Sequence, residues 1–468
     1  KQFIQIVFLQ FPPLVICYKC HLKNKLQQIW RKFMSHFQLS LFYDLQFLIQ
    51  NSNFYRKYYL LFKSLDLSAI QDKNYSIGRT GYSRRAMIRA FIVKHLEQIK
   101  SVPALIDFLD SHPALTEMCG FNMGTLPDPT QFYRFLSSAK NSSLQNLHHS
   151  IIKNLLNKNI ISDDILIVDS KPVMAATRDN NFKNPKRNSR NKNRKAKHNP
   201  YATLGYYSYQ TISGKKDNFI FFWGYRTHVI VSKEGVPLVE LTLPNNVKDA
   251  AAARKLIKKL KRVYGSRKGT ILLADAAYDE RAFYNFIVNE LKWQAFIPIN
   301  PRNKQQDKTF GPNGLPLCEA NLEMKSCGIT REKLRTRKKF RCPIKSSVKI
   351  AKNYPLGCPI NHPGFVGYGC TKYIDITNDA RSQVPRDSAS YKSTFNLRTE
   401  VERYFARLGD RELEQTTHYK MSAIKNQMTI AHLSLSLIAH AAAILMEQPD
   451  KIRCYRTFSR EPATCHTG

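Results

Sequence analysis

The sequence predicts a mixed α/β core that follows a helical region. Apolar runs of strand length occur at 165–168, 219–243 and 270–274, and they alternate with segments whose apolar residues recur at helical spacing. A segment rich in Lys, Arg, Pro and Gly, residues 301–392, interrupts this alternation. The chain has 468 residues, more than one ordinary domain requires, so we expect several domains.

Ser, Asp and Pro residues mark the expected helix starts of the first region. Ser101 and Asp128 are predicted N-caps, and Pro129 stands at the first helical position after Asp128. The segments with helical periodicity are 87–99, 101–112, 127–136 and 142–156. Short helices joined by tight turns in a basic chain are typical of a helix-turn-helix DNA reader and equally of a plain helical bundle, so both interpretations stand.

The α/β region supplies the remaining predicted elements. Its strands are 165–169, a hairpin over 219–243 that turns at Lys233-Glu234-Gly235, then 270–275 and 293–300. Its helices are 249–265, 280–291, 393–408 and 421–446. We therefore predict an N-terminal extension (1–55), a helical DNA-binding domain (56–160), a catalytic core in two parts (161–300 and 393–448), an insertion (301–392) and a loose tail (449–468).

No segment is expected to cross a membrane. The apolar stretch 3–18 is short and is broken by Pro12-Pro13, and it lacks the small-residue cleavage site of a signal peptide. The later segments do not look apolar enough to span a bilayer. We expect an intracellular protein without a membrane partner.

The charge of the chain points to a polyanionic partner. Lys and Arg number 73 against 35 Asp and Glu, which gives a formal net charge of +38. Nucleic acid is the commonest such partner; a ribosome-like or membrane-surface protein is the alternative. The loop 181–200 concentrates the charge, and its expected phosphate-binding residues are Lys186, Arg187, Arg190, Lys192, Arg194 and Lys195. The alternative for this loop is a solubilising role.

Two acids end apolar strands of the same predicted sheet. Asp169 follows 165–168, and Asp275 follows 270–274. Because the carboxyl ends of neighbouring strands lie side by side, we expect these carboxylates to converge. Converging carboxylates repel unless a cation joins them, and oxygen ligands favour Mg²⁺ or Mn²⁺. Each acid taken alone is more often a turn or cap residue than a ligand.

A third acid stands in the helical segment "RTEVERYFARL". Arg398 and Glu402 are four residues apart and share one face of the predicted helix. The alternative is an ordinary surface ion pair. Together the three acids in a basic α/β chain indicate two-metal phosphoryl transfer, with Asp169, Asp275 and Glu402 as ligands of two Mg²⁺ or Mn²⁺ ions.

At these residues the sequence resembles the DDE transposases of bacterial insertion sequences. The similar segments are "IVDSKPV", "GYRTHVIVSKEGVPLVE" followed by "NNVKD", "LLADAAYD" and "RTEVERYFARL". The resemblance implies a ribonuclease-H-like core and a metal-binding triad of Asp169, Asp275 and Glu402. It implies strand cleavage and joining at the terminal inverted repeats of an element, on double-stranded DNA and into target DNA. It also implies a homodimer in the DNA complex and a place in the bacterial cytoplasm with the nucleoid.

The resemblance also assigns roles to residues of the third motif. Arg398 is expected to contact DNA phosphate. Glu400 is the rival for the third acid, but on a helix it points about 200° away from Glu402. The group carries Tyr and Lys where this chain has Phe395 and Gly409. The alternatives are therefore a decayed transposase that only binds DNA, and a structure-specific nuclease on the same fold.

His228 lies on the second strand of the hairpin. It could face the site and contact DNA or a ligand-binding residue, or it could be an ordinary histidine satisfied within the sheet. No neighbouring motif decides between these interpretations.

Cysteines gather in the insertion. Cys318, Cys342, Cys358 and Cys370 are candidate ligands of a structural Zn²⁺, although their spacing is irregular. Cys327 lies among them. The pair in "CYKC" (17–20) has no partner pair nearby, so we do not assign it a metal. The basic run 331–341 in the insertion, with Arg337, Lys338 and Lys339, is expected to hold DNA ends.

Overall fold

The computed structural model describes residues 44–72, 81–122, 124–180, 195–210, 217–265, 269–300, 310–332, 335–377, 379–386, 388–409, 413 and 415–454. The chain divides into two compact units between Phe135 and Leu136. The apolar stretch 3–18, the "CYKC" pair and the loop residues Lys186, Arg187, Arg190, Lys192 and Arg194 lie outside the described residues, so the predictions made for them are left as predictions.

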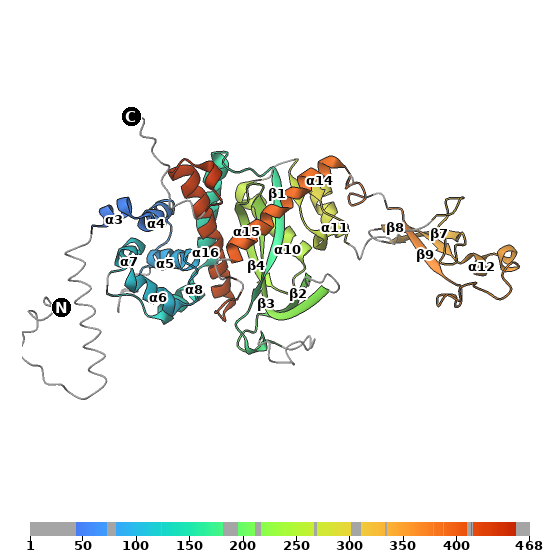
Figure 1. Cartoon of the computed structure of the whole chain (residues 1–468), viewed down its shortest axis with the longest axis horizontal. Helices are drawn as coiled ribbons and strands as arrows, with labels where there is room; N and C mark the ends of the chain where they lie inside the picture. The colour runs from blue at the N-terminus through green and yellow to red at the C-terminus, as the bar shows by residue number, and fades with distance from the viewer. Residues whose placement is uncertain are drawn as a thin grey trace, which may run out of the picture. The chain divides into compact units, whose positions relative to one another are not determined.

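The described part of the first unit is helical (Figure 1). Its helices are α3 (Leu45–Asn51), α4 (Asn53–Lys63), α5 (Arg84–Leu96), α6 (Val102–Ser111), α7 (Pro113–Cys119) and α8 (Pro129–Ser138). Both predicted N-caps are confirmed. Ser101 Oγ accepts from the N–H of Ala104 at 3.2 Å, and Asp128 Oδ1 accepts from that of Thr130 at 2.8 Å.

Helix α5 forms the centre of this unit. It is buried over nearly its whole length, from Ala86 to Leu96. Phe91 packs edge-on against Phe132 and stacks on Phe135, with ring centroids 5.7 Å and 6.0 Å apart. Burial around the whole circumference, which here includes Lys94 and His95, is typical of a helix enclosed by its neighbours.

The second unit contains a six-stranded mixed sheet. Its strands are β1 (Ile165–Met174), β2 (Thr203–Gln210), β3 (Asp217–Ser232), β4 (Pro237–Pro244), β5 (Ile271–Leu273) and β6 (Gln294–Phe296). The order is β2-β3-β1-β5-β6, and β4 pairs with β3. Strands β1 to β4 pair antiparallel, whereas β5 and β6 continue the sheet parallel to β1.

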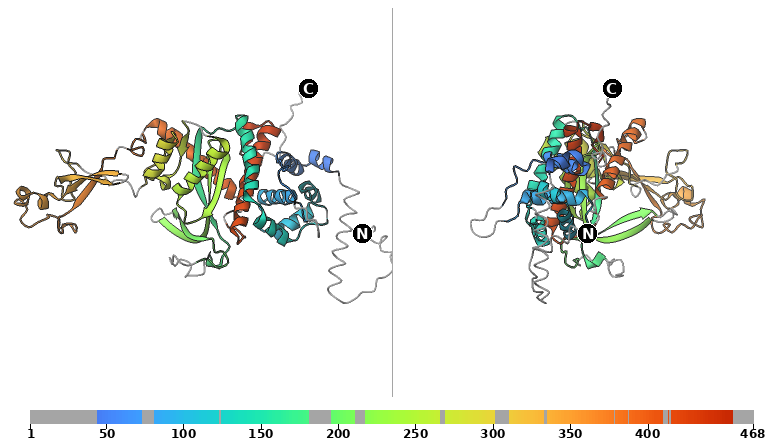
Figure 2. Two further views of the ribbon diagram at one scale, coloured as in Figure 1. Left: turned by 180° about the vertical axis from the view of Figure 1, so that it is seen from behind. Right: turned by 60° about the vertical axis from the view of Figure 1, so that its left-hand side comes forward.

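Helices pack on this sheet. They are α9 (Asn141–Asn157), α10 (Asp249–Tyr264), α11 (Arg281–Tyr284), α14 (Ala389–Phe395), α15 (Thr399–Gly409) and α16 (Met421–His440). Helix α10 contacts β3 and β4, α15 contacts β1, and α16 contacts β4 and α9. Figures 1 and 2 show the strands between α16 and α10. Helix α9, which we had assigned to the helical domain, therefore belongs to the second unit by its packing.

Strand β1 is longer than the sequence predicted. Our expectation that it ends at Asp169 is wrong, because it runs to Met174 and Asp169 pairs with Val229 of β3. From Val168 to Val173, however, the described strand pairing of β1 is with β3 alone, since its pairing with β5 stops at Leu273 and Met174 forms an isolated bridge with Gln415. An unpaired edge tolerates Pro172, which made this segment look like a loop.

Helix α16 and the π-helical turn that follows it (Ala441–Leu445) form the one described helix long and apolar enough to cross a membrane. This corrects our expectation that no later segment reaches that length and composition. Of its most apolar window, 89% is buried inside the structure. That burial is typical of the central helix of a protein core, so length and composition here are weak evidence for a membrane span.

A second, three-stranded sheet occupies the segment that we predicted to be an insertion. Its strands are β7 (Lys325–Glu332), β8 (Arg335–Arg341) and β9 (Thr371–Asp375). The short helices α12 (Pro343–Ser346) and α13 (Val348–Ala351) lie between β8 and β9 in the chain. Arg381 connects this segment to the loop after β5: it donates to Asp279 Oδ1 at 2.5 Å and to Asp279 Oδ2 at 2.7 Å.

The predicted helix 393–408 is interrupted in the structure. Helix α14 ends at Phe395, a 3₁₀ turn covers Asn396–Arg398, and α15 begins at Thr399. The turn places Arg398 at the junction of two helices.

Candidate active site

Asp169 lies within β1, beside the end of β5. Its register fixes this position, because Ile167 pairs with Leu273, so Asp169 and Asp275 each stand two residues beyond a paired position. The N–H of Ser170 donates to Asp169 Oδ1 at 2.7 Å. Burial raises the pKa of Asp169 to about 7, and Asp275 is the second cause of that rise. The predicted convergence of these two carboxylates agrees with this geometry.

Asp275 caps the 3₁₀ turn η3 (Ala276–Tyr278) that follows β5. Its Oδ1 accepts from the N–H of Ala277 at 2.9 Å. Burial raises the pKa of Asp275, and Asp249 raises it further, while the hydrogen bond and Arg398 act in the opposite direction. Two half-buried carboxylates therefore lie close together with ionisation disfavoured.

Asp249 is a third acid at this place, which sequence reasoning treated only as a helix start. It begins α10, and its Oδ1 accepts from Ser170 Oγ at 3.0 Å. It raises the pKa of both Asp169 and Asp275. The signal in the sequence was the position of Asp249 in "NNVKD", directly after the hairpin, where the chain returns to the edge of β1.

Tyr278 marks the point where the three acids meet. Its side chain is 1% exposed, and burial is the main cause of its raised pKa. The charges of Asp169, Asp249 and Asp275, in decreasing order, raise this pKa further. Among the described residues its hydroxyl has no hydrogen-bond partner. A buried polar atom without a partner, surrounded by carboxylates, is typical of a site that a further polar group completes.

Arg226 and His228 of β3 face Asp249. Arg226 Nη1 donates to Ser170 Oγ at 3.1 Å and lies 3.8 Å from Asp249 Oδ1. His228 is fully buried, and its Nδ1 lies 3.7 Å from the same oxygen. Burial lowers the pKa of His228 to about 4, although Asp249 acts to raise it. His228 is therefore neutral near neutral pH and lies beside the acids. Within the described residues neither ring nitrogen is hydrogen-bonded, so it is not an ordinary satisfied histidine.

Glu402 reaches the acids through Arg398. Arg398 Nη2 donates to Glu402 Oε1 at 2.5 Å, and the same guanidinium acts to lower the pKa of Asp169 and of Asp275. The Glu402 side chain is 53% exposed, so it stays accessible to solvent and to a ligand. Asp249 acts directly on the pKa of Asp169 and of Asp275, whereas the described contact of Glu402 is with Arg398.

Glu400 points elsewhere, as its place on the helix predicts. It is buried, and its carboxylate accepts from Arg403 and from Arg453, the latter at 2.7 Å. It also lies near Gly235 of the β3–β4 turn. This geometry gives Glu400 a role in holding α15 in place.

The carboxylates of the site are chemically suited to bind a divalent cation, although they do not form a complete ligand set. Asp169 and Asp275 offer carboxylate oxygens, the donors that Mg²⁺ and Mn²⁺ favour, and their raised pKa values reflect burial and the neighbouring carboxylates. Among the residues that the structure describes, no group of three or more His, Cys, Asp or Glu is arranged to hold a metal ion. Glu402 would have to exchange Arg398 for the ion.

The predicted DNA-binding residues of the second sheet lie on β8. Arg337 forms an ion pair with Glu332 and lies over the ring of Tyr373 at 4.6 Å. Lys338 and Lys339 lie over aromatic rings at 5.6 Å and 5.7 Å. All three are half-buried, whereas Lys195, the described residue of the basic loop, is exposed. Their contact with DNA stays a prediction.

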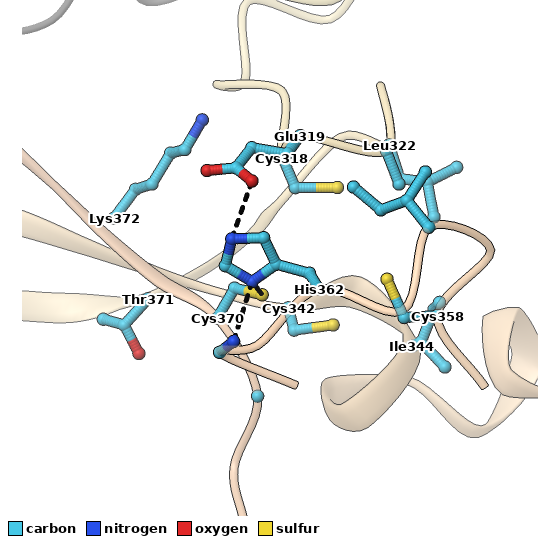
Figure 3. Close-up of a pocket in the computed structure, with 14 residues that line it drawn as sticks. Cys318, Glu319, Leu322, Cys342, Ile344, Cys358, His362, Cys370, Thr371 and Lys372 are labelled. Carbon is cyan, nitrogen blue, oxygen red and sulfur yellow. Dashed lines mark hydrogen bonds and ion pairs between the residues drawn. The ribbon is translucent and has the colours of Figure 1, made fainter. Parts of the chain in front are cut away.

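The four candidate zinc ligands come together. Cys318, Cys342, Cys358 and Cys370 line one pocket (Figure 3). Burial raises the pKa of the Cys370 thiol, and the other three thiols contribute to the rise. Cys327 on β7 is exposed and does not line the pocket.

Two family models match the chain. Residues 161–437 match a family described as "Transposase DDE domain", and residues 43–138 match one described as "Transposase domain (DUF772)". None of the curated proteins searched matches the chain.

Two solved structures show distant similarity. A piggyBac transposase synaptic complex with hairpin DNA is 8% identical at a TM-score of 0.36, over 90% of this chain and 81% of that one. A Mos1 transposase paired-end complex with the left transposon end is 14% identical at a TM-score of 0.16, over 57% and 73%. These similarities are too distant to transfer any detail of those complexes.

Proposed function

Because the chain belongs to the family of transposases with a DDE domain, we propose that it cuts and joins DNA strands at the terminal inverted repeats of an insertion sequence. In the first step water attacks a phosphodiester, and the bond to the 3′ oxygen breaks to release a 3′-hydroxyl. In the second step that hydroxyl attacks a target phosphodiester, and the 3′ oxygen of the target strand leaves. Neither step changes an oxidation state or needs an energy cofactor.

One observation carries this proposal: Asp169 and Asp275 lie together with their ionisation disfavoured. Asp249 is a further acidic neighbour of this pair, and Arg398 offsets only part of the charge that the three carboxylates bring together. Two divalent ions bound there would stabilise the attacking and leaving oxygens of an in-line displacement. Asp169, Asp275 and Glu402 are the proposed ligands, and Mg²⁺ is the proposed ion.

The surrounding residues of the chain orient this group. Ser170 ties Asp249 to β1 through its hydroxyl, and Arg226 supports the same hydroxyl from β3. Arg398 balances the charge of the carboxylates and, when Glu402 turns to an ion, becomes free to bind a DNA phosphate. Buried, neutral His228 lies beside Asp249, with its Nδ1 3.7 Å from Asp249 Oδ1.

The architecture supports the same function. A mixed sheet of antiparallel strands continued by two parallel strands, with helices packed on it, is consistent with a ribonuclease-H-like core. The helical unit would bind the repeats, and the second sheet would hold DNA ends. The net charge of +38 favours a DNA partner. A homodimer in the DNA complex is the family's arrangement and part of this proposal.

Phe395 favours a second candidate, a decayed transposase that binds DNA without cutting it. The Arg398 guanidinium lies 6.0 Å from the Phe395 ring centroid, so the aromatic contact to Arg398 is present without the hydroxyl that Tyr would add. Gly409 ends α15 and offers no ammonium. The carboxylates, in contrast, are all present.

Cleavage of a labelled duplex that carries the ends of the element tests the proposal. The wild type and the Asp169→Ala and Glu402→Ala variants are compared in Mg²⁺ and in Mn²⁺. We expect cutting at the element boundary by the wild type alone, and joined products when target DNA is added. Salt-sensitive binding without cutting in either metal would identify the decayed enzyme. Cutting without joining would identify a nuclease.

A further inference from the structure

The segment with the second sheet has very little apolar core. Its buried apolar cluster consists of Cys318, Met324 and Phe340, with a few partly buried neighbours. A segment this small cannot fix its fold by burial alone, and proteins of this size class use disulfides or a metal for that purpose. All of its cysteines are free thiols.

Backbone geometry holds two of these cysteines together. The N–H of Cys342 donates to the carbonyl of Cys370 at 2.8 Å, at the end of the β8–β9 pairing. Gly369 permits this approach: its φ is +77°, and a Cβ there would lie 2.6 Å from the Cβ of Cys342. The chain is therefore built to bring the Cys342 and Cys370 side chains into one pocket.

The other two cysteines occur in matching turns. Cys318 begins "CEAN" and Cys358 begins "CPIN". In each turn the cysteine carbonyl accepts from the N–H of the Asn three residues on, at 3.0 Å for Asn321 and 3.1 Å for Asn361. Both Asn residues have positive φ, +56° and +44°. Two separate loops thus present a cysteine in the same local conformation.

The four sulfur atoms border a common space. They line a pocket of about 260 Å³, and Figure 3 shows each sulfur directed toward its interior. Lys372 also lines the pocket and is held by the carbonyl of Leu317 at 2.7 Å. Its charge offsets part of the negative charge that four thiolates around a divalent ion would leave.

His362 connects this pocket to a carboxylate. Its Nδ1 lies 3.2 Å from the Cys370 sulfur and accepts from the N–H of Gly364 at 2.9 Å. Its Nε2 lies 2.7 Å from Glu319 Oε2. A carboxylate, an imidazole and a thiol in a row resemble the outer contacts that orient the ligands of metal sites. Sequence analysis missed His362; the signal was its place four residues after Cys358.

We propose that Cys318, Cys342, Cys358 and Cys370 bind one structural Zn²⁺, with His362 as a positioning residue beside Cys370. As described, the four thiols are not yet arranged to hold an ion; drawn together as thiolates, they would supply the closed tetrahedral set that structural zinc takes. The pocket is wider than an ion, so binding draws the two turns onto the Cys342–Cys370 pair. Zinc would then fix β9 and its neighbour β8, and β8 carries Arg337, Lys338 and Lys339. The proposal does not depend on strand cleavage.

Metal analysis of the purified full-length chain tests the site. We expect about one zinc per chain in the wild type. Cys327→Ser is the matched control, because Cys327 is in the same segment and outside the pocket, and it should keep the metal. Cys342→Ser and Cys370→Ser should each lower the zinc content at least about fivefold. No zinc in the wild type, iron in its place, or equal zinc in all variants would overturn the proposal.

A second measurement does not depend on the folding of any variant. The wild type is stripped with a chelator and titrated with Co²⁺, which should give sulfur-to-cobalt charge-transfer and tetrahedral absorption bands that Zn²⁺ abolishes. The absence of these bands, or a mass showing disulfides among the four cysteines, would contradict the site. His362→Ala should retain zinc. Loss of zinc in that variant with retention in Cys318→Ser would overturn the four-cysteine assignment.

Discussion

Arg398 Nη2 donates to Glu402 Oε1 at 2.5 Å, one helical turn away on the same face. The same guanidinium acts on the pKa values of Asp169 and Asp275, so this pair connects an accessible carboxylate on α15 with two half-buried ones on the sheet. Glu400, two residues earlier, is buried against Arg453 and has no such connection. Two glutamates that are two residues apart on one helix therefore have separable roles.

The first prediction separates these two glutamates. Glu402→Gln should lower strand cleavage by about 100-fold and change the free energy of unfolding by less than about 0.5 kcal/mol, because its ion pair is exposed. Glu400→Gln should cost about 1 to 3 kcal/mol of stability, because it weakens buried charged hydrogen bonds. Its cleavage per folded molecule should be unchanged. Chemical denaturation and single-turnover cleavage measure both, and the reverse pattern would assign the third acid to Glu400.

The second prediction concerns pH. The pKa of Asp169 is about 7 in the folded protein against an ordinary 3.8, so the folded state binds more protons between these values. The stability of the metal-free protein therefore falls as pH rises through this window. Asp169→Asn removes the free-energy cost of ionising this buried carboxyl and should stabilise the metal-free protein at about pH 8 by on the order of 1 to 3 kcal/mol. At about pH 4 the variant and the wild type should melt alike. A variant that is no more stable at the higher pH would show that burial does not disfavour this carboxylate.

The third prediction tests Asp249. Asp249→Asn keeps a group that accepts from Ser170 but removes a charge beside the Asp169–Asp275 pair. We expect cleavage to fall by about 10- to 100-fold, with a higher Mg²⁺ concentration needed for half-maximal rate. Asp164→Asn is the control, because Asp164 is an exposed acid paired with Lys233 at 2.7 Å. Equal rates for the two variants would remove Asp249 from the site.

The fourth prediction concerns the junction of α8 and α9. Buried Asn426 on α16 donates to the carbonyls of Leu136 and Ala139 at 2.7 Å and 2.9 Å and accepts from Asn141. Asn426→Ala leaves the two carbonyls without this donor, although Asn141 keeps its bond to Thr429 at 2.9 Å. The change should cost about 2 to 4 kcal/mol of unfolding free energy. Asn289→Ala, at an exposed position, should change it by less than about 0.5 kcal/mol. Similar denaturation midpoints for both variants would contradict the structural role of Asn426.

The site residues that directly follow apolar runs could be predicted from the sequence. Asp169 and Asp275 could be predicted to converge, because each follows an apolar run of the same predicted sheet and the carboxyl ends of neighbouring strands lie side by side; β1 and β5 do pair in parallel. Glu402 could be separated from Glu400 by helical geometry alone. The resemblance of the motifs supplied the expected chemistry.

Other features depend on contacts that no local pattern encodes. Strand β1 continues past Asp169 because β3 pairs with Ser170, Lys171 and Pro172, which look like loop residues by themselves. Asp249 and His228 join the site through the fold of the β3–β4 hairpin and α10. Cys318 and Cys358 meet in space from turns forty residues apart, and the resemblance between "CEAN" and "CPIN" becomes informative only when both turns are seen.

The most direct test of the proposed metal site replaces the carboxylate of one proposed metal ligand with a sulfur atom. Asp169→Cys replaces carboxylate oxygens with a sulfur, which Mg²⁺ accepts poorly and the softer Mn²⁺ accepts better. Asp164→Cys serves as the control and should cleave at the wild-type rate in both metals. If Asp169 holds a catalytic ion, Asp169→Cys should lose cleavage by about 100-fold in Mg²⁺ and recover at least about tenfold in Mn²⁺, relative to the wild type in each metal. An equal loss in both metals, or full activity in Mg²⁺, would contradict the proposal that Asp169 binds a catalytic cation.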